Sequence, residues 1–489
     1  MLPILLILTA AFAVLTWRDL HTGLLLLVAV LPSYLLRTEI FGVPTTLLEL
    51  LVVTFLVVWI LKRGDRQWLC AWRRLPLIPL SLLIAATISV FVAPDIASAL
   101  GAWKAYFVEP ILLFLVIKYE LASSPSHLCG LPPTPPSPLF DRELRVERPS
   151  GRGGTGCGIT VEQIFRSLGV TAIVLSLVAI FQWLTGSGLP IPWDIARRVT
   201  SVFDYPNALG LFLGPVVTIS LLNLCHPERA KRVEGSRTDH SGSLHFARLW
   251  PGFGRDDTTL FWLSVTILSS IAIVLAQSEA AIVSVVATLL IAGFLHQKTR
   301  VLSISLIVLT IVATLLFPPL LQKLTLQDYS GGVRLSQWSE TIDMLQDRWL
   351  LGAGLSGYPT ALEPYHKATH LEIFQYPHNI ILNIWVELGL LGLLAVALLA
   401  WQVIVSSRPS ARERRDPSTP RELVARDDTG SYSSSLGMTQ MIAFLALLQM
   451  TIHGLVDVPY FKNDLAILTW ILLAIVFAYA RPTTPATKP

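Results

Sequence analysis

The chain has 489 residues, of which 53% are hydrophobic and only 14% are charged, and its formal net charge is +4. About a quarter of the residues of a soluble domain are charged, so this composition excludes an ordinary soluble protein. The small net charge does not suggest a nucleic-acid partner. The apolar residues come in runs of about 17 to 22, the length that crosses a bilayer as a helix. We therefore predict an all-α polytopic membrane protein.

About thirteen apolar runs are candidate spans. They lie near residues 2–17, 20–36, 43–61, 75–93, 99–118, 166–185, 207–224, 259–276, 280–296, 300–317, 379–405, 439–456 and 464–480. Only Trp17, Arg18 and Asp19 separate the first two runs, so either half of 2–36 is open to being a short or re-entrant segment. The prediction is about 12 or 13 transmembrane helices.

Basic residues gather in alternate loops, which sets the predicted orientation. The clusters are Lys62–Arg74, Arg142–Arg152, Arg229–Arg237, Lys298–Arg300 and Arg408–Arg415. Because cytoplasmic loops retain positive charge, these loops are predicted to be cytoplasmic and the opposite loops extracytoplasmic. The long loop 318–378 then lies outside the cytoplasm.

Spans and loops divide the chain into five predicted segments. They are the N-terminal helices 1–118, a cytoplasmic low-complexity loop 119–165, the central helices 166–317, the extracytoplasmic loop 318–378 and the C-terminal helices 379–489. Two further cytoplasmic stretches, 225–257 and 406–438, are rich in Pro, Ser, Gly and Arg and lack an apolar period. Such stretches are expected to be loosely packed and to carry no activity.

The loop 318–378 contains a predicted amphipathic helix between Arg334 and Leu350. Its apolar side chains recur at spacings of three and four, at Leu335, Trp338, Ile342, Leu345 and Trp349. At a membrane surface, its charged residues would face water or a site; they are Arg334, Glu340, Asp343, Asp347 and Arg348. A solvated helix face explains Asp343 and Asp347, so we expect no metal site there.

His378 and Asn379 stand where this loop re-enters the membrane, and Gly389 and Gly392 follow in the span. A histidine at the mouth of a span titrates near neutral pH and is suited to take a proton from a hydroxyl group. The competing interpretation is a capping or interfacial histidine. One helical turn separates Gly389 from Gly392, which predicts a smooth strip for close helix packing.

This pattern resembles the O-antigen ligase and polymerase superfamily, whose members handle undecaprenyl-diphosphate-linked glycans outside the cytoplasmic membrane. The family has His, then Asn, Ser or Gln, nine residues, Gly, two residues, and Gly, Thr or Tyr, which His378, Asn379, Gly389 and Gly392 match. The resemblance covers about 170–480 and includes Arg334, Trp338, Gly352, Gly354, the stretch 198–203 and Pro206-Asn207. Ser201 stands where the family has a glycine.

One position departs from the family. Where members commonly carry Ser-Arg-Gly, with the arginine proposed to hold the lipid diphosphate, this chain has Gln277-Ser278-Glu279-Ala280. A carboxylate at this hinge repels a diphosphate. Three explanations stay open: a substitute cation from Arg197, Arg198 or Arg334, a different donor, or loss of the transfer activity.

The resemblance implies an inverting, metal-independent glycosyltransferase without a cofactor, in the cytoplasmic (inner) membrane with its active side extracytoplasmic. Its partners would be an undecaprenyl-diphosphate-linked glycan, a lipid or glycan acceptor and membrane lipids. We assign His378 as the base or as the group that orients the acceptor, and the substrate-binding residues are Arg334, Arg198, Arg197, Asn379 and Asn207. His453 and Asp457 are weaker candidates, interpreted as a structural pair at another span's outer end.

Two alternatives remain at this point. The first is a polymerase of glycan repeat units in the same superfamily, because ligases and polymerases share the loop and the histidine. The second is a transporter or flippase of a lipid-linked or anionic substrate, which the ionisable residues in or near the spans permit: Glu49, Lys104, Glu109, Glu279 and Glu387. The exterior loop has no counterpart in the first half of the chain, which disfavours a transporter built from repeats.

Overall fold

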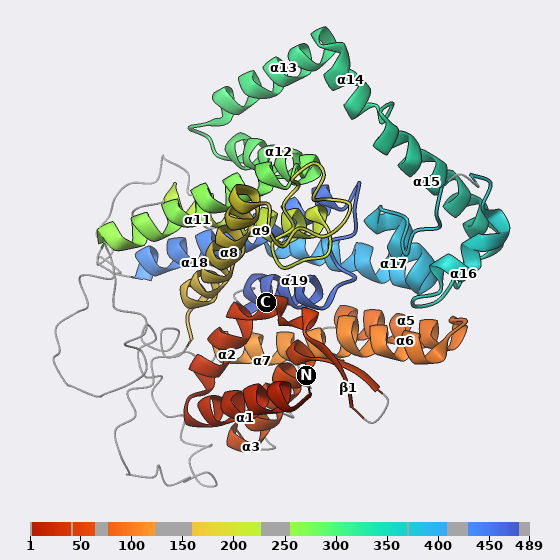
Figure 1. Ribbon diagram of the computed structural model, residues 1–489. Helices are drawn as coiled ribbons and strands as arrows, with labels where there is room; N and C mark the ends of the chain where they lie inside the picture. Colours follow the sequence, from red (N-terminus) through yellow and green to blue (C-terminus); the bar gives the residue numbers. More distant parts are fainter. Residues whose placement is uncertain are drawn as a thin grey trace, which may run out of the picture.

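The computed structural model describes residues 2–40, 43–63, 77–122, 159–225, 255–368, 371–407 and 429–478. These residues form an all-helical polytopic membrane protein (Figure 1), which confirms the predicted fold class. Every candidate span is helical over most of its described length. The predicted low-complexity stretches 119–165, 225–257 and 406–438 lie largely outside the described residues.

Among the described residues, five helical segments are long and apolar enough to cross a membrane. They are 96–122, which joins α6 (Ile96–Trp103), a π-helical turn (Lys104–Val108) and α7 (Glu109–Ala122), then α8 (Val161–Thr185), α9 (Pro206–Leu224), α11 (Arg255–Leu275) and α17 (Ile380–Ser406). The other span helices are α1 (Leu2–Arg18), α2 (Leu20–Ala29), α3 (Leu47–Arg63), α5 (Leu77–Val92), α12 (Glu279–Leu295), α13 (Arg300–Leu316), α18 (Thr429–His453) and α19 (Asn463–Ala478).

The second candidate span, 20–36, is not one continuous α-helix. Its α-helical part, α2, has 10 residues, which rise only about 15 Å, half the thickness of the hydrocarbon core. A 3₁₀ turn at Leu31–Leu35 continues it and contains Pro32, which lacks the amide hydrogen that an α-helix needs.

The third candidate span, 43–61, begins with a strand and not with a helix. Residues Arg37–Ile40 (β1) pair antiparallel with Val43–Thr46 (β2), a small hairpin that the all-α prediction missed. Thr and Val residues favour strands because their branched side chains fit a pleated surface. Thr46 and Glu49 then start α3, since each accepts the other's backbone N–H.

Capping also explains why α8 begins at Val161, before the apolar run at 166. The Thr160 hydroxyl accepts the backbone N–H of Gln163, and the Gln163 side chain accepts that of Thr160. Apolar periodicity locates the buried part of a helix, whereas hydrogen-bonding side chains at the cap decide where it begins.

The bundle packs around α19, whose side chains are buried along almost its entire length. In Figure 1, α19 (blue) lies between the N-terminal helices and the central helices, and it packs directly on α7 and α18. Phe114 of α7 meets Trp470 of α19 edge-on, with ring centres 5.2 Å apart. Because α19 is apolar on all faces, it is most stable in the middle of the bundle, where other helices cover each face.

The loop 318–378 is helical for much of its length. It contains α14 (Pro318–Leu324), α15 (Tyr329–Asp347), α16 (Tyr358–Leu362) and a 3₁₀ turn (Glu363–Tyr365). Figure 1 shows α13 running away from the bundle and α14 and α15 leading back toward α16 and α17. The predicted helix at 334–350 is therefore α15, which starts five residues earlier because Asp328 accepts the N–H of Gly331 and caps it.

Gly389 interrupts α17, so the predicted continuous strip from Gly389 to Gly392 is wrong. Its backbone is left-handed, with φ +66°, and the N–H of Leu390 donates to the Leu350 carbonyl at 2.9 Å. A Cβ at Gly389 would collide with the backbone of Leu350 and Leu351. The glycine thus lets the loop after α15 dock into the break in α17.

Candidate functional site

His378 lies directly before α17, and Asn379 caps that helix. The Asn379 side-chain oxygen accepts the N–H groups of Ile381 and Leu382, and its amide donates to the Leu455 carbonyl at 3.0 Å. His378 itself has a left-handed backbone with φ +47°, which is uncommon for a residue with a side chain. Asn379 therefore fixes the backbone from which the imidazole projects.

The imidazole of His378 faces Asp457, which belongs to the turn between α18 and α19. Nδ1 of His378 lies 3.5 Å from Oδ1 of Asp457, whose side chain is only 2% exposed. Burial opposes ionisation of this carboxyl, yet His378, His453 and the Val458 N–H together hold the Asp457 pKa below its usual value. A carboxylate at Nδ1 orients an imidazole and leaves Nε2 to accept a proton.

Arg334 and His453 border the same turn. Arg334 donates to the Val456 carbonyl at 3.1 Å and to the Ser330 hydroxyl at 2.8 Å. His453, at the end of α18, is buried, and neither ring nitrogen has a hydrogen-bond partner. The structure therefore gathers five of the predicted residues around one turn, since Asn379 also donates to it at Leu455, and it pairs Asp457 with His378, where the sequence suggested only a structural pair with His453.

α15 holds the segment that leads into His378. Gln337 donates to the Tyr376 carbonyl at 2.8 Å, and the indole of Trp338 donates to the Pro377 carbonyl at 2.8 Å. The rings of Tyr376 and Phe374 stand edge-on to the imidazole, with centres 4.8 and 5.3 Å away. Sequence reasoning missed Gln337, Tyr376 and Phe374, because only the fold brings them to His378.

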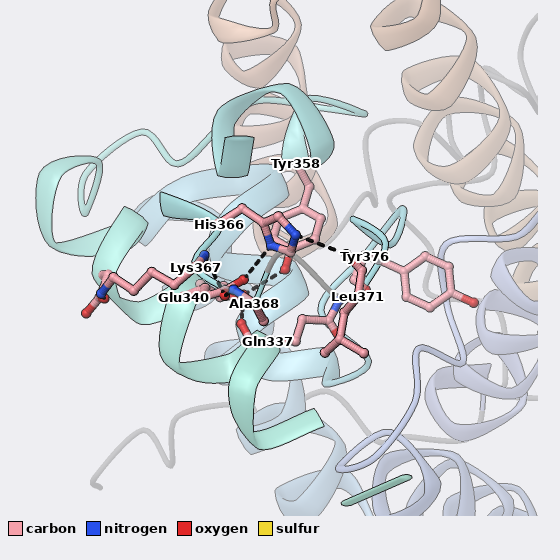
Figure 2. Close-up of polar contacts among 10 residues, drawn as sticks. Gln337, Glu340, Tyr358, His366, Lys367, Ala368, Leu371 and Tyr376 are labelled. Atoms are coloured by element: carbon pink, nitrogen blue, oxygen red, sulfur yellow. Dashed lines mark hydrogen bonds and ion pairs between the residues drawn. The ribbon is translucent and has the colours of Figure 1, made fainter. Parts of the chain in front are cut away.

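The Glu340 carboxylate anchors the start of the same segment (Figure 2). It accepts the backbone N–H groups of Lys367 and Ala368, both at 2.9 Å, and contacts Nδ1 of His366 at 3.0 Å. Nε2 of His366 lies 3.1 Å from the Leu371 carbonyl. Glu340, which was expected to face water or a site, is 5% exposed because these donors replace its water shell.

A second group of predicted residues meets at the break between α11 and α12. Arg198 donates to the carbonyls of Ala276 and Gln277 at 3.2 and 3.4 Å, and its guanidinium stacks 5.0 Å above the ring of Trp193. Burial lowers the Arg198 pKa, and Glu279 opposes this effect. Of the three arginines considered as substitutes for the family arginine, Arg198 is the one that contacts this hinge.

Glu279 is exposed at the hinge and forms an ion pair with Lys323 of α14. The hinge therefore combines one carboxylate with two cations, Arg198 and Lys323. Sequence reasoning missed Lys323, because 44 residues separate it from Glu279. The net charge of Arg198, Lys323 and Glu279 together is positive, and a positive charge attracts a diphosphate.

Arg197 and Asn207 flank this region. Arg197 is exposed, with a left-handed backbone at φ +47°, and Asn207 lies in the first turn of α9. Tyr205 lies between these two residues in the sequence, and its phenol oxygen is 3.0 Å from that of Tyr376. This contact connects the segment that carries Arg198 with the segment that carries His378.

Comparison with known proteins locates a family match on this region. Residues 264–397, from α11 into α17, match the model of the O-antigen ligase family. The match includes the hinge, α15 and His378, and it confirms the predicted resemblance to the O-antigen ligase superfamily over this part of the chain. None of the curated proteins compared with the chain matches it.

Proposed function

We propose that this protein, a polytopic membrane member of the O-antigen ligase superfamily, transfers an undecaprenyl-diphosphate-linked glycan to a hydroxyl of a lipid or glycan acceptor. The reaction would take place on the extracytoplasmic side of the cytoplasmic membrane. The observation that carries the proposal is the contact of His378 with the buried Asp457, beside Arg334 and at the mouth of α17. An oriented base next to a cation suits the transfer of a group that leaves as an anion.

In the proposed step, Nε2 of His378 takes the proton of the acceptor hydroxyl. The acceptor oxygen bonds to the anomeric carbon of the donor sugar as the bond from that carbon to the diphosphate oxygen breaks. The electron pair of the broken bond departs with the diphosphate, and attack from the opposite face inverts the anomeric centre. Arg334 and Arg198 stabilise the departing charge. No step is assigned to a metal or cofactor.

The other predicted residues take supporting roles in this proposal. Asn379 holds the His378 backbone through its cap on α17. Exposed Arg197 offers a further cation to the diphosphate next to Arg198, and Asn207 offers an amide to the substrate at the start of α9. Glu279 pairs with Lys323 and reduces the positive charge of the hinge without cancelling it, so its presence is compatible with transfer activity.

Transfer from a purified undecaprenyl-diphosphate glycan to acceptor, with the full chain in nanodiscs and EDTA present, tests the proposal. His378→Ala should lower the rate by about 10²- to 10⁴-fold, because that is the usual contribution of a general base. His296→Ala is the matched control, since His296 lies exposed at the far end of α12. A wild-type rate in His378→Ala, or complete loss with EDTA, contradicts the proposal.

Polymerisation of repeat units is the same chemistry with a growing glycan as acceptor, and the choice of acceptor in this assay separates it from ligation.

The transporter alternative is less well supported. Lys104 pairs with Glu49 at 2.9 Å, Glu387 accepts the Ser356 N–H at 2.6 Å, and Glu279 pairs with Lys323. Groups held in such contacts stabilise one packing of helices, whereas transport requires two. Glu109 is the exception among the five, because its Oε1 is buried without a hydrogen-bond partner.

A further inference from the structure

A chain of three polar side chains ends at the ring that packs on His378. The Lys462 ammonium donates to the Tyr205 phenol and lies 4.0 Å from the centre of its ring. The Tyr205 oxygen lies 3.0 Å from that of Tyr376, whose ring stands edge-on to His378 at 4.8 Å. The order of contacts is therefore Lys462, Tyr205, Tyr376 and His378.

Each member of the chain lies just before a helix of the bundle. Tyr205 precedes α9, Tyr376 is two residues before His378 at the start of α17, and Lys462 precedes α19. Lys462 therefore connects three segments that are distant in sequence. One of them carries Arg198 and another carries His378, so the chain links the two groups of candidate site residues.

Tyr376 is held at both ends. Gln337 fixes its backbone carbonyl, and Tyr205 fixes its phenol oxygen. Figure 2 shows its side chain directed away from the contact between Glu340 and His366, so that contact does not hold the ring. With its two ends fixed, the ring forms a defined wall for the imidazole.

We propose that Lys462 is a positioning residue for the transfer reaction and acts on His378 through Tyr205 and Tyr376. This inference rests on the proposed function. An ammonium has donors only, so the Tyr205 oxygen accepts from Lys462 and its hydroxyl hydrogen is free for Tyr376. Loss of the charge releases both rings, and a base misplaced by about 1 Å can lose about 10²-fold in rate.

The charge of Lys462 depends on its surroundings. Burial lowers the Lys462 pKa from its usual value, while Asp464 of α19 and Asp204 of the segment before α9 oppose the shift. The ammonium is therefore lost at a lower pH than that of an exposed lysine. The positioning role therefore predicts that kcat for transfer depends on pH through the charge of Lys462.

The first experiment compares transfer kinetics of the full chain in nanodiscs at pH 7.5 and pH 9. Lys462→Met should lower kcat by about tenfold or more and leave the donor KM within about threefold, because the base is misplaced while the donor site is intact. Lys462→Arg should retain activity and lose less of it at pH 9 than the wild type, since arginine stays charged. Lys298→Met, at an exposed turn, is the control.

The second part of the experiment tests the hydroxyl groups of Tyr205 and Tyr376. Tyr205→Phe and Tyr376→Phe should each lower kcat, and Lys462→Met combined with Tyr205→Phe should be no slower than the slower single variant. Residues in one hydrogen-bonded chain are coupled, so their effects do not add. Wild-type kcat in Lys462→Met, or additive losses in the double variant, overturn the inference.

A readout without transfer keeps the inference separate from the proposed function. Diethyl pyrocarbonate modifies accessible imidazoles, and mass spectrometry measures the modification of His378, whose side chain is 24% exposed. Lys462→Met should increase this modification by about threefold, because a freed Tyr376 ring no longer covers the imidazole. If no donor is transferred by the wild type, the proposed function fails, and unchanged modification in Lys462→Met independently overturns the positioning role.

Discussion

The buried carboxylate of Asp457 lies 3.5 Å from Nδ1 of His378, although the two residues precede different helices of the bundle. We expect this pairing to decide which imidazole nitrogen is free, because a carboxylate beside Nδ1 favours the tautomer with its proton on that nitrogen. In the proposed mechanism, Nε2 is then the nitrogen that meets substrate.

Asp457→Asn should lower kcat for transfer by about 100-fold or more, since an amide can favour the opposite tautomer of the imidazole. Donor binding should change little. The measurement is the same nanodisc assay, with Asp347→Asn on α15 as the control. A variant with the wild-type kcat would show that Asp457 does not orient the base.

The hinge predicts a compensation between Lys323 and Glu279. Lys323→Met leaves the carboxylate of Glu279 uncompensated near Arg198 and should raise the donor KM about two- to fivefold, the range expected for an exposed pair. Lys323→Met combined with Glu279→Gln should restore the wild-type KM. The difference should shrink at high salt, because exposed charges are screened. A double variant as poor as Lys323→Met alone argues against the compensation.

The contact of Glu340 with His366 predicts a pH dependence of the segment before His378. The hydrogen bond to Glu340 raises the His366 pKa, so its stabilisation is complete below about 6.5 and is lost as the pH rises through the raised value. Burial opposes ionisation of Glu340, but the His366 imidazole and the N–H groups of residues 367 and 368 lower its pKa. That stabilisation is present above about 4.5 and is lost at lower pH.

Hydrogen exchange at Lys367 and Ala368 measures this stabilisation, after correction for intrinsic rates. Exchange should be slower at pH 6 than at pH 8.5 in the wild type, since the protonated imidazole supports the carboxylate that both amides contact. His366→Gln should remove the difference between the two pH values. The same pH dependence in His366→Gln would exclude His366 as its source.

Gly389→Ala tests the break in α17. The left-handed backbone and the nearby backbone of Leu350 and Leu351 leave no room for a methyl group, so unfolding should become easier by about 1 to 3 kcal/mol. Gly101→Ala is the control, because a Cβ there meets no atom within 4 Å. Thermal unfolding in detergent gives both Tm values. An unchanged Tm for Gly389→Ala would mean that the loop does not need this close approach.

Local chemistry determined the helical membrane fold, because an apolar run of sufficient length favours a helix in lipid whatever its neighbours are. The same applies to the position of His378 and Asn379 at the start of α17. The break at Gly389 and the hairpin at 37–46 were not predicted. Apolar periodicity indicates which residues are buried away from water. The left-handed conformation of Gly389 depends instead on the backbone that docks against it, and the hairpin depends on the pairing of its two strands.

The partners within the candidate site were decided by the tertiary structure. The sequence placed Arg198, Glu279, His378 and Asp457 near the ends of spans, but it did not pair His378 with Asp457, choose Arg198 among the three arginines considered for the hinge or bring Lys323 to Glu279. Spans are specified one by one through their own hydrophobicity. Contacts between their ends depend on how all the helices pack, and a charge separated from its partner by tens or hundreds of residues carries no local sign of it.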